Sequence, residues 1–124
     1  MVEKKKPLVL VVEDDPNSQM LVKFFLRDNY DTYFAVSVTE AKEKLDNQPV
    51  ELILLDLSLE GQEDGLDLVR YLRKTKRWKD ILIIAVTAHA FTADREKCLA
   101  AGCDDYLAKP YRKADLLEKM KQFV

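Results

Sequence analysis

The sequence lacks any apolar segment long enough to cross a membrane. Its longest uninterrupted apolar run is residues 81–86, whereas a membrane-spanning helix needs about 20 such residues. The lysine-containing N-terminus is not followed by the apolar stretch that marks a signal peptide. We therefore expect a cytoplasmic protein that makes no membrane contact.

Metal-binding patterns built on cysteine and histidine are also missing. The two cysteines, Cys98 and Cys103, are five positions apart, and the chain has a single histidine. This spacing matches neither a CxxC pair nor a zinc site, so we interpret both cysteines as reduced side chains packed near a helix end. The 20 basic and 22 acidic residues leave a formal net charge of −2, which argues against a dedicated nucleic-acid surface.

What the sequence does contain is a regular alternation of apolar segments and amphipathic segments. Its 48 % hydrophobic content is typical of a globular domain with a core. Continuous apolar runs predict strands that are covered on both faces, and two weaker runs predict edge strands. The predicted strands are residues 8–12, 33–36, 52–55, 81–86 and 106–108.

The helices between these strands carry start signals and apolar spacing. Pro16 occupies a first-turn position behind Asp14 and Asp15, either of which can cap a helix. The apolar residues that follow helical spacing are Leu21, Phe24 and Phe25 in the first helix, Ala41 and Leu45 in the second, Leu68, Val69 and Leu72 in the third, and Leu116, Met120 and Phe123 in the last.

Strict alternation of strand and helix predicts an α/β fold with right-handed crossovers and helices on both faces of a parallel sheet. Five strands suit the doubly wound, flavodoxin-like order 2-1-3-4-5, although patterning alone leaves other orders open. No repeat, low-complexity segment or linker interrupts the chain. We therefore expect residues 1–124 to form one domain, with no DNA-binding domain attached.

Charged and polar residues follow the predicted strands at the end where such folds bind ligands. Glu13 and Asp14 follow the first strand, Asp56 follows the third, Thr87 the fourth and Lys109 the fifth. In the 2-1-3-4-5 order, the first and third strands are neighbours, so their carboxylates should converge.

Converging carboxylates repel one another, and a divalent cation would remove that repulsion. Mg²⁺ suits such a site because it binds a few carboxylates, keeps several waters and can also hold a phosphoryl oxygen; Mn²⁺ is the alternative. A cation beside a carboxylate nucleophile offsets the charge that develops in phosphoryl transfer. Together with a lysine and a hydroxyl donor, the pattern predicts an aspartyl-phosphate site.

Five motifs in this order resemble the receiver domains of two-component signalling, and the resemblance covers nearly the whole chain. The motifs are Val11-Val12-Glu13-Asp14, Leu54-Leu55-Asp56, Asp64-Gly65, Val86-Thr87-Ala88 and Lys109-Pro110, with Tyr106 three residues before the lysine.

The resemblance implies a role for each matching residue near the phosphoryl group. Asp56 would be the phosphoacceptor, and Thr87 and Lys109 would contact the phosphoryl oxygens. The Lys109-Pro110 bond resembles the family's cis peptide bond, and Tyr106 matches the residue whose rotation reports phosphorylation.

The resemblance also implies how the cation is held. Glu13, Asp14 and Asp56 would bind it directly or through water, and Ser58 would offer its backbone carbonyl. Two features depart from the family's usual pattern. Glu13 stands where many members have aspartate, and the loop of residues 56–65 lacks the usual proline and is one residue longer.

Receiver domains take their phosphoryl group from a sensor histidine kinase or a histidine phosphotransfer protein, so the resemblance implies such a partner, together with a downstream protein target that the sequence does not identify. We expect a signalling phosphoacceptor and not an enzyme that acts on other substrates. A haloacid-dehalogenase-type phosphatase would need an acidic residue where Ser58 stands. A flavodoxin would need a phosphate-binding loop where Glu13 and Asp14 would repel phosphate. The remaining alternative is a receiver-like interaction module that is never phosphorylated.

Overall fold

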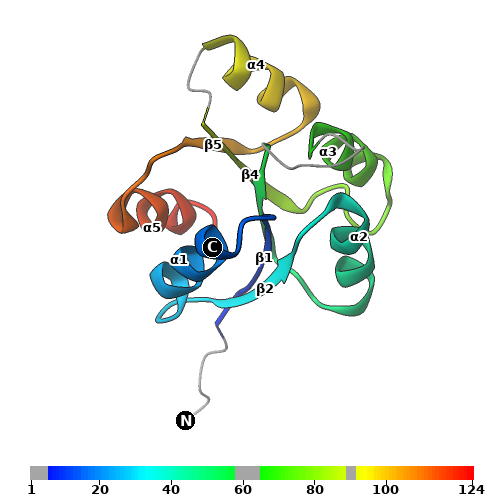
Figure 1. Cartoon of the computed structure of the whole chain (residues 1–124). Helices are drawn as coiled ribbons and strands as arrows, with labels where there is room; N and C mark the ends of the chain where they lie inside the picture. Colours follow the sequence, from blue (N-terminus) through cyan, green and yellow to red (C-terminus); the bar gives the residue numbers. More distant parts are fainter. Residues whose placement is uncertain (1–5, 58–64, 89–91) are drawn as a thin grey trace.

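The computed structural model describes residues 6–57, 65–88 and 92–124, in which strands and helices alternate along the chain (Figure 1). The strands are β1 (Leu8–Val12), β2 (Asp31–Ala35), β3 (Leu52–Asp56), β4 (Leu82–Thr87) and β5 (Asp105–Ala108). The helices are α1 (Pro16–Leu26), α2 (Val38–Asn47), α3 (Gly65–Lys74), α4 (Thr92–Ala101) and α5 (Lys113–Lys121). None of the helices in these ranges is long and apolar enough to span a membrane.

The strands form one parallel sheet with the order β2-β1-β3-β4-β5, which confirms the predicted fold class and strand order. The two segments with the weakest apolar character, β2 and β5, lie at the edges of the sheet, as predicted. Because β1 and β3 are direct neighbours, the residues that follow them lie side by side at the carboxyl edge of the sheet.

Alternate residues of the central strands point to opposite faces of the sheet and build two separate apolar clusters. In β1, Val9 and Val11 pack with α1 and α5, whereas Leu10 and Val12 pack with α2 and α3. Figure 1 shows the same division, with α1 and α5 on one side of the sheet and α2 and α3 on the other. Each fully buried aliphatic side chain contributes about 1.5–3 kcal/mol, so both faces hold the carboxyl edge in place.

The first helix forms as predicted, but its buried face differs from the predicted one. Val22 and Leu26 are buried and Phe25 is half-buried, whereas Leu21 and Phe24 are 50 % and 52 % exposed. Nearly every position in the second half of α1 is apolar, so helical spacing is compatible with more than one buried face. Contact with the core and α5 determines which face of α1 is buried.

Other predictions differ from the structure by small shifts at the ends of elements. β2 covers Asp31–Ala35, so its core lies earlier than the predicted residues 33–36, and Val36 is exposed. Phe123 is half-buried and lies beyond the end of α5. The predicted buried residues of the other helices are confirmed, namely Ala41, Leu45, Leu68, Val69, Leu72, Leu116 and Met120.

Hydrogen bonds from Arg73 stabilise the connection from α4 to β5. The guanidinium of Arg73 in α3 donates to the carbonyl oxygens of Gly102 at 2.8 Å, Lys79 at 3.0 Å and Ile81 at 2.6 Å, and pairs with Asp104 at 3.0 Å. Gly102 has a φ of 119°, and a Cβ there would lie 2.8 Å from Arg73 Cγ. Glycine therefore lets the chain leave α4 close against Arg73 and enter β5 in register.

Candidate functional site

Backbone hydrogen bonds place two acidic residues immediately after β1. The amide of Glu13 donates to the Ala35 carbonyl at 2.9 Å, which continues the pairing of β1 with β2. Asp15 then caps α1 by accepting from the Asn17 amide at 3.1 Å. From the first turns of that helix, the Gln19 side chain donates back to the Glu13 carbonyl at 2.6 Å. The turn between β1 and α1 is thus held on both sides of Glu13 and Asp14.

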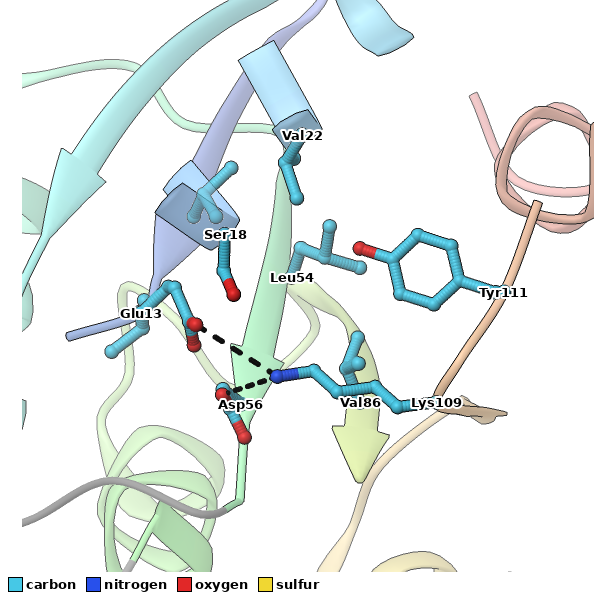
Figure 2. A pocket seen from close by; sticks show the side chains of 10 residues that line it. Glu13, Ser18, Val22, Leu54, Asp56, Val86, Lys109 and Tyr111 are labelled. Atoms are coloured by element: carbon cyan, nitrogen blue, oxygen red, sulfur yellow. Dashed lines mark hydrogen bonds and ion pairs between the residues drawn. The ribbon is translucent and has the colours of Figure 1, made fainter. Parts of the chain in front are cut away.

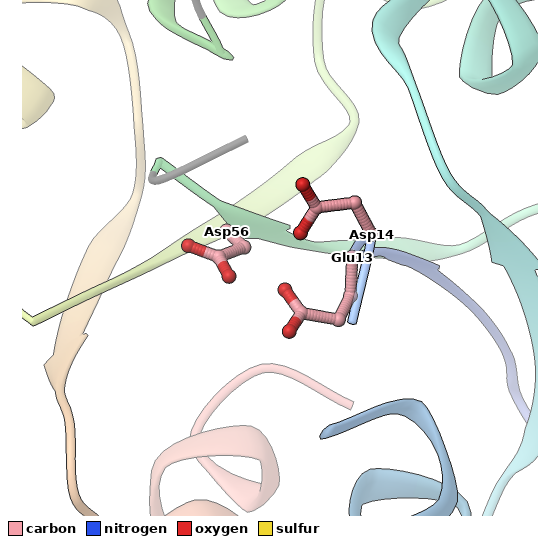
Figure 3. A group of neighbouring side chains, drawn as sticks. All are labelled: Glu13, Asp14 and Asp56. Atoms are coloured by element: carbon pink, nitrogen blue, oxygen red, sulfur yellow. The ribbon is translucent and has the colours of Figure 1, made fainter. Parts of the chain in front are cut away.

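The carboxylates of Glu13 and Asp14 converge with that of Asp56, the last residue of β3 (Figure 3). One carboxylate oxygen from each residue lies within 4.8 Å of the others. Glu13 is 4 % exposed and Asp56 is 5 % exposed, and Asp14 is half-buried. The structure therefore brings together the three acidic residues that the sequence predicted to converge.

Lys109 reaches the same cluster from the end of β5, as Figure 2 shows. Its Nζ lies 2.7 Å from Asp56 Oδ2 and 3.8 Å from Glu13 Oε1. The Lys109 amide donates to the carbonyl of Thr87 at 2.8 Å, which ties the ends of β4 and β5 together. Thr87 itself is buried, and the Lys109-Pro110 peptide bond is cis, as predicted.

The crowding of these charges shifts their pKa values. Burial, together with the neighbouring Asp56 carboxylate, raises the pKa of Glu13 to about 8, although the charge of Lys109 acts in the opposite direction. Burial alone would lower the pKa of Lys109, but contact with Asp56 and the charges of Glu13 and Asp14 outweigh it and raise that pKa. One lysine therefore compensates the acidic cluster only in part.

This fold and site match a known family model, the response regulator receiver domain, over residues 9–121. The chain belongs to the response regulator receiver family. It is similar to the TorCAD operon transcriptional regulatory protein TorR of Escherichia coli O157:H7, with 36 % identity over 94 % of this chain and 49 % of that regulator. The chain spans about half the length of several curated relatives that it matches.

Two solved receiver domains resemble this one in structure as well as sequence. The receiver domain of sensor histidine kinase PA1611 from Pseudomonas aeruginosa PAO1, with magnesium coordinated in its active-site cleft, is 33 % identical with a TM-score of 0.86, over 96 % of this chain and 98 % of that one. The receiver domain of Ssk1 from Saccharomyces cerevisiae, in complex with the phosphotransfer protein Ypd1, is 28 % identical with a TM-score of 0.86, over 95 % and 88 %.

The acidic cluster of this receiver domain fits a divalent cation. Glu13 Oε2 is buried and accepts no hydrogen bond within the described part of the chain, a costly arrangement for an ionised carboxylate. The converging oxygens are hard donors of the kind that Mg²⁺ prefers. A bound Mg²⁺ would supply positive charge to the oxygens of a transferring phosphoryl group.

Two residues of the motifs that carry the resemblance, Ser58 and Asp64, fall outside the described residues. The carbonyl expected to bind the cation and the first residue of the Asp64-Gly65 motif are therefore not placed. Tyr106 in β5 is half-buried and packs against the apolar cluster that contains α2 and α3.

The sequence analysis missed two residues of the site, Ser18 and Tyr111. Both line a small cavity beside Glu13 and Asp56 (Figure 2). Their spacing offered a signal: Ser18 lies in the first turn of a helix that starts at the acidic cluster, and Tyr111 lies two residues beyond Lys109. A side chain in either place is directed back toward the carboxyl edge of the sheet.

Proposed function

We propose that this receiver domain accepts a phosphoryl group on Asp56 from the phosphohistidine of a sensor kinase or phosphotransfer protein, and that phosphorylation changes a surface which binds another protein. The observation that carries the proposal is the position of Asp56: a buried carboxylate at the end of a central strand, 2.7 Å from Lys109 and beside two further carboxylates. The complex of Ypd1 with the Ssk1 receiver supports a histidine-containing donor.

The residues around Asp56 divide the work of phosphoryl transfer. An Asp56 carboxylate oxygen attacks phosphorus as the bond from phosphorus to the donor's imidazole nitrogen breaks, and the imidazole leaves with the bonding electron pair. Lys109 orients the Asp56 carboxylate and then stabilises the phosphoryl oxygens. Glu13, Asp14 and Asp56 would hold the Mg²⁺, whose charge offsets that of the incoming phosphate.

A switch through β4 and β5 accounts for signal output. The phosphoryl group adds charge and acceptor oxygens next to Thr87 at the end of β4. Rotation of the Thr87 hydroxyl toward those oxygens would change the space available to Tyr106, which pairs with Ala85 of β4. The phosphoryl group can shift this equilibrium only through contacts that differ between the two states, and the hydrogen bond to Thr87 is one such contact.

The phosphoacceptor is tested with acetyl phosphate and Mg²⁺ as a small donor, followed by intact-mass measurement. We expect the wild type to gain one phosphoryl group, and Asp56→Asn to gain none. Asp46→Asn, which changes an exposed aspartate in α2, is the matched control and should be labelled like the wild type. Equal labelling of Asp56→Asn would refute the assignment. No labelling of any form, by acetyl phosphate or by a phosphorylated histidine phosphotransfer protein, would favour an interaction module that is never phosphorylated.

A further inference from the structure

A small cavity lies on the core side of the acidic cluster. It has a volume of about 20 Å³ and is lined by the polar side chains of Glu13, Ser18, Asp56, Lys109 and Tyr111, together with apolar side chains of α1, β1, β3 and β4. An internal water needs a space of roughly 10–15 Å³ and two to four polar partners. The cavity therefore has room for one water molecule.

Three of the polar side chains, those of Glu13, Ser18 and Tyr111, offer complementary hydrogen-bonding groups. Glu13 Oε2 is buried and accepts no hydrogen bond from the described residues. The Ser18 hydroxyl donates to Asp15 Oδ2 at 3.0 Å, so its own oxygen can accept. Figure 2 shows the hydroxyl ends of Ser18 and Tyr111 turned toward the space beside the Glu13 carboxylate. A water that donates to Glu13 and Ser18 and accepts from Tyr111 would satisfy all three.

This cavity adjoins the place where the cation would bind, because Asp56 and Lys109 line it as well. Asp14 belongs to the acidic cluster but does not line the cavity. Glu13 Oε1 is the oxygen near Lys109, at 3.8 Å, while Oε2 is the buried one without a partner among the described residues. The two Glu13 oxygens therefore differ in their surroundings, and Oε2 is the one left to accept a hydrogen bond from a water in the cavity.

The Tyr111 ring is well placed to hold its hydroxyl at a fixed point. The ring is half-buried, belongs to the apolar cluster of α1 and α5, and meets the Phe25 ring edge-on with centroids 6.4 Å apart. Edge-to-face aromatic pairs are energetically favoured, so this contact stabilises the position of the Tyr111 ring. The hydroxyl therefore cannot swing away from the cavity without disturbing packing against α1.

We propose that Tyr111 is a positioning residue for Glu13: its hydroxyl, one internal water and the Ser18 oxygen hold Glu13 Oε2, so that Oε1 faces Lys109 and the cation. The water site depends only on the residues that line the cavity. The effect on cation binding rests on the proposed function. Partners of this kind, which hydrogen-bond a metal-binding side chain, typically change metal affinity by about 10–100-fold.

The test is Tyr111→Phe, which keeps the ring and its contact with Phe25 but removes the hydroxyl. We expect the Kd for Mg²⁺, measured by calorimetry, to rise about tenfold, at the lower end of that range. Tyr30→Phe is the matched control because Tyr30 is a buried tyrosine of the same apolar cluster that does not line the cavity; its Kd should equal that of the wild type. Thermal unfolding without metal checks that both variants are folded.

Two further measurements separate a bridging water from a general packing effect. A high-resolution crystal structure of the metal-free wild type should show a water that contacts Glu13 Oε2 and the Tyr111 hydroxyl. Because Ser18 and Tyr111 act through one water, the double variant Ser18→Ala/Tyr111→Phe should bind Mg²⁺ no more than about twofold more weakly than Tyr111→Phe. A wild-type Mg²⁺ affinity in Tyr111→Phe, or a cavity without that water, would overturn the inference. If the water is found and Tyr111→Phe binds Mg²⁺ more weakly, but the wild type is not labelled on Asp56, only the proposed function is overturned.

Discussion

The acidic cluster should make the metal-free protein less stable as the pH rises. Glu13 has an ordinary pKa of 4.5, and burial beside Asp56 raises the pKa of Glu13 to about 8 in the folded protein. Between these values the folded state holds a proton that the unfolded state has released. The free energy of unfolding therefore falls with increasing pH in this window, because stability decreases wherever the folded state binds more protons.

The size of the effect follows from the shift. Each pKa unit corresponds to about 1.4 kcal/mol, so a rise from 4.5 to about 8 sets a ceiling of about 5 kcal/mol for Glu13. Lys109 is 27 % exposed and lies next to the cluster, so solvent reaches its edge and screens part of the repulsion. We expect a loss on the order of 3 kcal/mol between pH 5 and pH 8 without a divalent cation.

Urea unfolding in EDTA at several pH values between 5 and 8 measures this loss, and Glu13→Gln is the matched variant. Glutamine has similar size but cannot ionise, so this variant should lose much less stability over the same range, and the difference between the two proteins isolates Glu13. In saturating Mg²⁺ the wild-type loss should largely disappear, because the cation stabilises the ionised carboxylates. Parallel pH profiles for wild type and Glu13→Gln in EDTA would show that Glu13 is not the buried acid that titrates.

Substitutions at three other residues test separate parts of the site and fold. Asp14→Ala should weaken Mg²⁺ binding at least about tenfold, as measured by NMR titration; an unchanged affinity would remove Asp14 from the cation site. Thr87→Ala should still bind beryllofluoride, a phosphoryl mimic, but without the wild-type NMR shifts around Tyr106; retention of those shifts would show that the switch does not run through Thr87. Arg73→Ala should lower the free energy of unfolding by about 2–4 kcal/mol, because it removes donors to three carbonyls, and Arg73→Lys should recover only part of it in the same urea assay.

The sequence predicted the convergence of Glu13, Asp14 and Asp56 once the strand order 2-1-3-4-5 was adopted, because topology then decides it. Continuous apolar runs fix which segments are central strands, and strict alternation with helices makes those strands parallel. Once β1 and β3 are neighbours, the residues after them meet at one edge whatever their side chains. This step needs no knowledge of rotamers or distances, which is why it survives errors at the ends of individual elements.

The buried face of α1 could not be predicted in the same way. A helix with apolar residues on most sides has no single periodic stripe, so spacing favoured Leu21 and Phe24, while the structure buries Val22 and Leu26. The choice depends on how α1 sits against β1 and α5, which is a tertiary property. The roles of Ser18 and Tyr111 were hidden for the same reason, since each becomes meaningful only when α1 and the segment after β5 approach one carboxylate from two sides.

Glu13 shows why the site and the stability of the fold must be considered together. A buried carboxylate with a raised pKa opposes folding at neutral pH. Apolar strands such as β1 and β3 could instead be followed by residues that do not oppose folding. The same burial removes water from Asp56, and charges act more strongly on a transferring phosphoryl group where water is excluded. The two apolar clusters hold the carboxyl edge rigid on both faces, so the acidic residues cannot relieve their repulsion by moving apart. Without a cation the cluster limits its repulsion by keeping Glu13 protonated, and a bound cation would let all three carboxylates ionise.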